Sequence, residues 1–146
     1  MLVATDVHAI SSLDDDYNRD YMAAADILFM SHEHLPMPPR DWARAIIERF
    51  GTALVVIGMG AGGALLSLKN GYVQHFPAVK TRPIVNTIGA GDALFSAFVH
   101  AYSQNHDPVD ALTKATLFAS YKIGETGAAM GFLSESELNQ LAREYR

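Results

Sequence analysis

The stretch Val85-Asn86-Thr87-Ile88-Gly89-Ala90-Gly91-Asp92-Ala93-Leu94-Phe95 decides how the rest of the chain is interpreted. Two glycines and an alanine lead into Asp92, which opens an apolar-periodic segment that predicts a helix to Tyr102. Glycines let the backbone turn sharply and come close to a ligand, and the amides at a helix start attract anions. A carboxylate is negatively charged and cannot attract a phosphate bound beside it, so Asp92 is not expected to bind the phosphate. We therefore expect Asp92 to accept a proton from a hydroxyl that attacks the phosphate.

A structural role is the alternative for Asp92. Aspartate is one of the commonest N-cap residues, and Gly-Ala-Gly-Asp by itself is a short match. The rest of the chain has to decide between the catalytic and the capping interpretation.

Composition limits the class of protein. The 146 residues suit one compact domain, which we expect to span residues 1–146. The absence of cysteine excludes a disulfide scaffold and thiol catalysis, and a cytoplasmic protein is the default expectation. With 11 basic and 16 acidic residues, a net charge of −5 and no basic cluster, neither nucleic acid nor a membrane is expected as a partner. We find no spanning segment and no signal peptide.

Three short apolar runs predict buried strands, at Leu2–Thr5, Ile27–Met30 and Ala53–Ile57. The last is almost wholly apolar, as in a parallel strand that is covered on both faces. A chain that starts directly on such a strand suggests that something upstream is missing.

Helices are predicted between and after these strands. They are a short helix at Arg19–Ala25, one that starts within Pro38-Pro39-Arg40-Asp41 and is stopped by Gly51, one that starts within Asn105-His106-Asp107-Pro108 and runs to about Ile123, and a last short helix capped by Ser134-Glu135-Ser136-Glu137. In the second helix the expected buried face carries Trp42, Ala45, Ile46 and Phe50. Asn70-Gly71 predicts a type I′ hairpin that joins strands Ala64–Leu68 and Tyr72–Phe76.

A second glycine-rich segment, Gly58-Met59-Gly60-Ala61-Gly62-Gly63, is a candidate phosphate or nucleotide loop. It is not a Walker loop, since no Gly-Lys-Ser/Thr follows, and it is not a dinucleotide fingerprint, since a strand rather than a helix comes next. A purely structural turn is the alternative.

Two segments carry metal-ligating residue types without a convincing pattern. Asp14-Asp15-Asp16 is better interpreted as a solvated loop. In Ser31-His32-Glu33-His34, alternate positions of an extended segment point to opposite sides, so a surface loop is favoured. The metal ligands therefore stay unknown.

Taken in order, these segments resemble the C-terminal half of a ribokinase-like (PfkB-type) carbohydrate kinase. The family signature is Asp-Thr-x-Gly-Ala-Gly-Asp followed by an apolar helix, and the chain departs from it only at Asn86. The resemblance implies an α/β fold with a largely parallel sheet flanked by helices and a local β-hairpin. It also implies phosphoryl transfer from ATP, with Mg²⁺, to a sugar or nucleoside hydroxyl.

The resemblance assigns roles to individual residues. Asp92 takes the position of the catalytic base, and Gly89, Ala90 and Gly91 that of the anion hole. Gly58, Gly60 and Gly63 align with the nucleotide loop, with Gly58 where a hydroxyl residue is usual, and Thr116 falls near the adenine pocket.

Some positions depart from the family pattern. Asn86 replaces an aspartate associated with a monovalent-cation site, so cation activation is in doubt. Ser31 and His34 stand where Asn-x-x-Glu would organise Mg²⁺ and phosphate. The lost Asn-x-x-Glu motif favours the alternative of a non-catalytic nucleotide-binding or oligomerisation module, whereas the intact Gly89 to Asp92 favours the enzyme.

Members of the family are about twice as long, and their N-terminal half grips the sugar. We therefore do not expect the chain alone to phosphorylate a sugar at a useful rate. A sheet without that half exposes an edge, so a homo-oligomer or a partner chain that covers the edge is expected.

Overall fold

The computed structural model describes residues 3–7, 12, 18–33, 35–78 and 90–122. They belong to two compact units, Met1–Pro77 and Ala78–Arg146, each of which is described by itself. The predicted helix from Ser134 and most of the segment around Asp14-Asp15-Asp16 lie outside the described residues.

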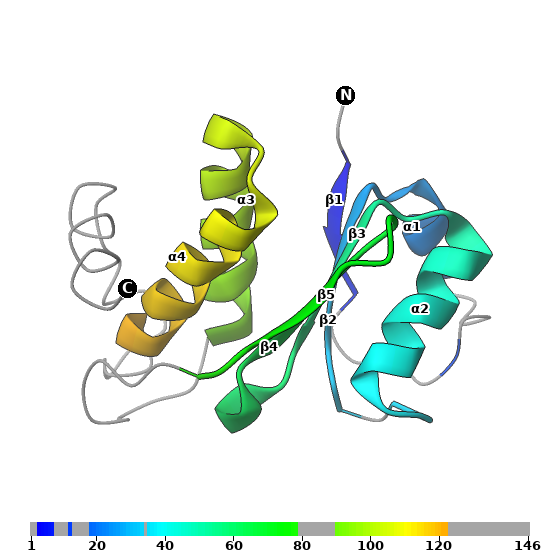
Figure 1. The fold of residues 1–146 in the computed structure, drawn as a ribbon, viewed down its shortest axis with the longest axis horizontal. Helices are drawn as coiled ribbons and strands as arrows, with labels where there is room; N and C mark the ends of the chain where they lie inside the picture. Colours follow the sequence, from blue (N-terminus) through cyan, green and yellow to red (C-terminus); the bar gives the residue numbers. More distant parts are fainter. Residues whose placement is uncertain (1–2, 8–11, 13–17, 34, 79–89, 123–146) are drawn as a thin grey trace. The chain divides into compact units, whose positions relative to one another are not determined.

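The first unit is built on a sheet with the strand order β1-β2-β3-β4-β5 (Figure 1). Its strands are β1 (Ala4–Asp6), β2 (Ile27–Ser31), β3 (Leu54–Gly58), β4 (Ala64–Leu68) and β5 (Val73–Phe76). β1, β2 and β3 are parallel, whereas β4 and β5 continue the sheet in antiparallel pairs. The predicted α/β class with a parallel sheet and a hairpin is confirmed, although the antiparallel part includes the β3–β4 pair as well.

Parallel neighbours need a crossover, and helices supply it here. α1 (Arg19–Ala24) lies between β1 and β2, and α2 (Pro39–Phe50) lies between β2 and β3. Gly51 ends α2 as predicted, in the left-handed conformation with φ 69°, and its N–H donates to the Ile47 carbonyl at 2.8 Å.

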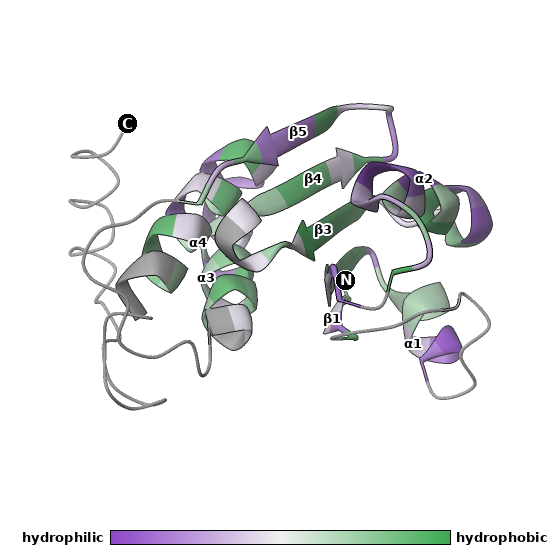
Figure 2. Cartoon of the chain, turned by 90° about the horizontal axis from the view of Figure 1, so that it is seen from below, coloured by the Kyte–Doolittle hydropathy of each residue, from purple (hydrophilic) through white to green (hydrophobic). Residues whose placement is uncertain are grey.

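The core of this unit lies between the sheet and the helices α1 and α2. It consists of Val7, Met22, Ala25, Leu28, Met30, Trp42, Ala43, Ile46, Val55, Ile57 and Leu65. Figure 2 shows the matching pattern, with β3 and β4 mainly hydrophobic and α2 of mixed character. The predicted buried face of α2 is confirmed for Trp42, Ile46 and Phe50, the last of which packs half-buried against the core. The prediction missed Ala43, which is fully buried, whereas Ala45 is only half-buried.

Four of the five predicted strands differ in their bounds from the structure: β3 spans Leu54–Gly58 instead of Ala53–Ile57, β5 begins at Val73 instead of Tyr72, and β1 and β2 differ as well. β1 includes Asp6, which pairs with Phe29, so this carboxylate ends the strand rather than following it. β2 extends one residue further than predicted, because Ser31 pairs with Gly58 at the end of β3.

The hairpin between β4 and β5 was predicted correctly, but its turn type was not. A type I′ turn needs positive φ at both Asn70 and Gly71, and of these two only Gly71 has it, at 97°. The N–H of Gly71 donates to the Leu68 carbonyl at 3.0 Å, and the N–H of Leu68 donates to the Tyr72 carbonyl at 2.8 Å. The connection is therefore a three-residue loop, 69–71, with glycine in the left-handed position.

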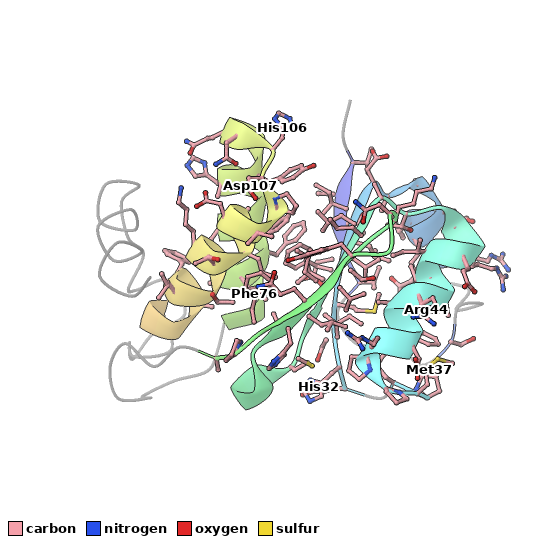
Figure 3. The ribbon with its side chains drawn as sticks, viewed as in Figure 1. His32, Met37, Arg44, Phe76, His106 and Asp107 are labelled. Carbon is pink, nitrogen blue, oxygen red and sulfur yellow. The ribbon has the colours of Figure 1, made fainter. Side chains whose placement is uncertain are left out.

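The second unit contains α3 (Ala90–Asn105) and α4 (Pro108–Lys122), which pack along each other. α3 ends at Asn105, three residues past the predicted end at Tyr102. His106 takes a left-handed φ of 55°, and its ring meets the Tyr102 ring edge-on at 5.4 Å. Asp107 caps α4, since its Oδ1 accepts the N–H groups of Val109 and Asp110 at 3.1 and 3.2 Å (Figure 3).

Candidate functional site

The glycine turn, defined as residues 58–63, connects β3 to β4. Gly58 and Ala64 face each other in the β3–β4 ladder, so the chain reverses through the residues between them. Within the turn, η1 (Gly60–Gly62) forms one turn of 3₁₀ helix. Gly60 has φ 57° and Gly63 has φ 89° with ψ −132°, conformations in which a side chain is strained. The candidate nucleotide glycines 58, 60 and 63 are thus brought together in one tight reversal.

Internal hydrogen bonds close the glycine turn. The N–H of Met59 donates to the Gly63 carbonyl at 2.8 Å, and the N–H of Gly63 donates to the Gly60 carbonyl at 3.0 Å. The N–H of Gly62 donates to the Met59 carbonyl at 2.9 Å. These bonds direct carbonyls into the turn, which leaves a compact backbone that a ligand can approach without meeting a Cβ at the glycines.

Two histidines from other strands bind the glycine turn. His32, directly after β2, donates to the Gly58 carbonyl from its backbone N–H at 2.9 Å and from Nδ1 at 3.1 Å (Figure 3). His75, on β5, donates from Nε2 to the Gly62 carbonyl at 2.6 Å. Sequence reasoning placed His32 in a surface loop and His75 only in a strand. Their contacts depend on the strand register, which no local pattern reveals.

The segment compared with the Asn-x-x-Glu motif is only partly described, because His34 lies outside the described residues. Ser31 is half-buried, and its Oγ accepts the N–H of Glu33 at 3.2 Å, so the hydroxyl is oriented by its own loop. Over residues 3–7, 12, 18–33, 35–78 and 90–122, no three side chains of His, Asp or Glu gather closely enough to hold a metal ion.

The structure describes the family signature, residues 86–92, only from Ala90 onward, at the start of α3. Ala90, Gly91 and Asp92 are its first three residues, whereas Gly89 and Asn86 lie outside the described residues. A capping residue precedes the first helical residue, so Asp92 does not occupy the N-cap position. Gly91 is exposed, and a Cβ added there would meet no atom within 4 Å. The first amides of a helix have no intrahelical acceptor, which is the property that an anion hole requires.

Thr116 lies on α4 and is half-buried. Its Oγ1 donates to the Thr113 carbonyl at 2.9 Å, just as Thr113 Oγ1 donates to the Val109 carbonyl at 2.8 Å. Since the hydroxyl hydrogen of Thr116 is directed into the helix, its oxygen can only accept a hydrogen bond from a ligand.

The family of the chain is indicated by its sequence. The profile of the pfkB family carbohydrate kinases matches residues 11–135. The deoxyribokinase of Salmonella typhi is 34% identical over 101 residues, which cover 69% of this chain and 32% of that protein.

Solved structures agree with the fold. A microbiome-derived acarbose kinase matches 97% of this chain and 48% of its own with a TM-score of 0.88 and 23% identity. The ribokinase of Arabidopsis thaliana, complexed with ribose and ATP, matches 98% of this chain and 48% of its own with a TM-score of 0.81 and 18% identity. The chain thus spans about half the length of these structures. Among the described helices, none has the length and apolar content needed to cross a bilayer.

The conformation of Gly63 yields a testable prediction. Alanine at this φ and ψ costs about 1–3 kcal/mol, so Gly63→Ala should lower the free energy of unfolding by that amount. Gly62→Ala is the matched control, because its Cβ would meet Met59 Cβ at 3.4 Å without a positive φ. Urea unfolding of both variants measures the difference. Equal stabilities of the two variants would contradict the strained geometry of the turn.

Proposed function

Because the chain belongs to the pfkB family of carbohydrate kinases, we propose that it carries the nucleotide-binding and catalytic portion, residues 1–146, of an ATP-dependent kinase that phosphorylates a hydroxyl of a sugar or nucleoside. The observation that carries the proposal is the position of Asp92 in the first turn of α3, directly after Ala90 and Gly91. First-turn aspartates also stabilise α1, α2 and α4, at Asp20, Asp41 and Asp110, so what supports a catalytic Asp92 is the glycine-rich sequence Gly89-Ala90-Gly91 directly before it.

In the proposed reaction Asp92 accepts the proton of the acceptor hydroxyl. The hydroxyl oxygen forms a bond to the γ-phosphorus of ATP, the bond from that phosphorus to the bridging oxygen breaks, and ADP leaves. The amides of Gly89, Ala90 and Gly91 donate hydrogen bonds to the oxygens of the transferring group, where negative charge develops.

The glycine turn and Thr116 hold the nucleotide in this proposal. Gly58, Gly60 and Gly63 allow the backbone to approach the nucleotide closely. Thr116 offers an acceptor to a donor group of the base, in line with its bonded hydroxyl hydrogen. Mg²⁺ bound to ATP supplies neutralisation of phosphate charge. Since the described residues form no metal cluster, the ion is expected to enter with the phosphates of the nucleotide.

A second candidate is a non-catalytic nucleotide-binding or oligomerisation module of the same fold. It is favoured by Ser31 and His34, which stand in place of the motif that organises Mg²⁺; the Oγ of Ser31 accepts a hydrogen bond from the N–H of Glu33 in its own loop. This module would bind nucleotide without Asp92-dependent transfer.

We expect the chain to bind a small-molecule sugar or nucleoside and to be cytoplasmic. We also expect a second copy or a partner chain to cover a sheet edge. β1 and β5 form the two edges of the described sheet, and unpaired strand edges favour association. Light scattering of the purified chain tests this expectation. A mass of at least two chains is predicted for association with a second copy, and a mass of one chain at all concentrations contradicts a homo-oligomer.

The catalytic role predicts a specific loss in Asp92→Asn. Asparagine cannot accept the hydroxyl proton, so we expect transfer of labelled phosphate from Mg·ATP to fall by about 10²–10⁴-fold while nucleotide affinity is retained. Ribose and deoxyribose are the first acceptors to test. Single-turnover conditions are suited to the measurement because slow turnover is expected for this chain.

Asp107→Asn is the matched control, since it makes the same change at the start of α4, where asparagine caps equally well. Transfer that is equal in the parent chain and in Asp92→Asn would contradict the proposed base. Nucleotide binding without transfer to any acceptor would favour the non-catalytic module.

A further inference from the structure

His32 and His75 bind the glycine turn from its two sides, although they are far apart in the sequence. The strand order places β2 and β5 on either side of the β3–β4 pair that carries the turn. One histidine follows β2 and the other lies on β5, where it pairs with Leu65. The turn is therefore held from both flanking strands.

The bond from His32 acts on the first peptide of the turn. This peptide contains the carbonyl of Gly58 and the N–H of Met59. The carbonyl accepts from the backbone N–H of His32 at 2.9 Å and, in addition, from His32 Nδ1 at 3.1 Å, and the N–H donates across the turn to the Gly63 carbonyl at 2.8 Å. Because both polar groups of the peptide are engaged, the orientation of its plane is determined where β3 enters the turn.

The bond from His75 acts in the same way on the last peptide. The Gly62 carbonyl accepts from His75 Nε2 at 2.6 Å, and the N–H of Gly63 donates to the Gly60 carbonyl at 3.0 Å. The two ring hydrogen bonds thus orient the peptides at both ends of the glycine turn.

A glycine-rich turn depends on such bonds more than other turns do. Glycine loses more conformational freedom on ordering than any other residue, and it has no side chain that packs to hold the backbone. A loop that is already ordered binds a ligand more tightly, because less ordering remains to be done on binding. Both histidines are exposed, so replacing them leaves no cavity in the core.

We propose that His32 and His75 are positioning residues, whose ring N–H groups hold the glycine turn in the conformation that binds nucleotide. This inference rests on the function proposed above. Neither histidine is assigned a contact with the reacting atoms. Since a carbonyl only accepts, Nδ1 of His32 and Nε2 of His75 carry the hydrogens.

The test compares variants that remove each donor with variants that replace it. His32→Phe and His75→Phe keep a ring without a donor, whereas His32→Asn and His75→Gln place an amide N–H near the lost ring nitrogen. His100→Phe is the matched control, because His100 is an exposed histidine on α3, in the other unit. The dissociation constant of Mg·ATP and the melting temperature are measured for each purified chain.

We expect each phenylalanine variant to raise the dissociation constant about fivefold, the double variant to raise it further, and the melting temperature to change by no more than about 2 °C. His32→Asn, His75→Gln and His100→Phe should retain the affinity of the parent chain. A purely structural role would lower the melting temperature together with the affinity.

Three results overturn the proposal. The first is that the parent chain binds Mg·ATP and the phenylalanine variants bind it with the same affinity, a result that leaves the proposed function intact. The second is a loss of affinity that His32→Asn and His75→Gln do not restore. The third is a parent that binds no Mg·ATP, which overturns the proposed function as well and so differs from the first two.

Discussion

The reversal between β3 and β4 is the constraint on which the candidate site depends. β3 runs apolar as far as Gly58, and β4 starts opposite it at Ala64, so the chain must turn back within the residues between them. Only glycine adopts the conformation of Gly63 without strain, and Gly60 has a left-handed φ as well. The same absence of side chains that permits the reversal lets a ligand come close to the backbone. The fold and the proposed function therefore both require residues without a side chain at these positions.

The neighbouring strands β2 and β5 bring further residues to the glycine turn. Because β2 ends opposite Gly58 and β5 pairs with β4, residues from separate parts of the chain meet at the glycine turn. His32 and His75 reach it there, and Ser31 is held beside it by the end of β2. The catalytic carboxylate of the proposal is held differently, by the first turn of α3. The proposal thus assigns roles to a sheet turn in one unit and to a helix start in the other, each at glycine-rich sequence.

Local sequence signals predicted most elements because each depends on a local cause. The end of α2 follows from Gly51, and the β4–β5 hairpin follows from Asn70-Gly71. The turn type differs because the Leu68–Tyr72 pair closes a three-residue loop in which only Gly71 has a positive φ. The roles of His32 and His75 could not be predicted, since their partners lie 26 and 13 residues away and are set by strand register. The resemblance to a family supplied the chemistry of Asp92, which spacing alone left open between a base and a cap.

The central claim is that this chain binds nucleotide at the glycine turn and at the start of α3. The most direct test is to label the 11 glycines with ¹⁵N and record their amide resonances with and without Mg·ATP. The account predicts shifts for Gly58, Gly60, Gly63, Gly89 and Gly91, and none for Gly51 or Gly71. Resonances that stay unchanged at a saturating excess of Mg·ATP, or shifts confined to Gly51 and Gly71, would contradict it.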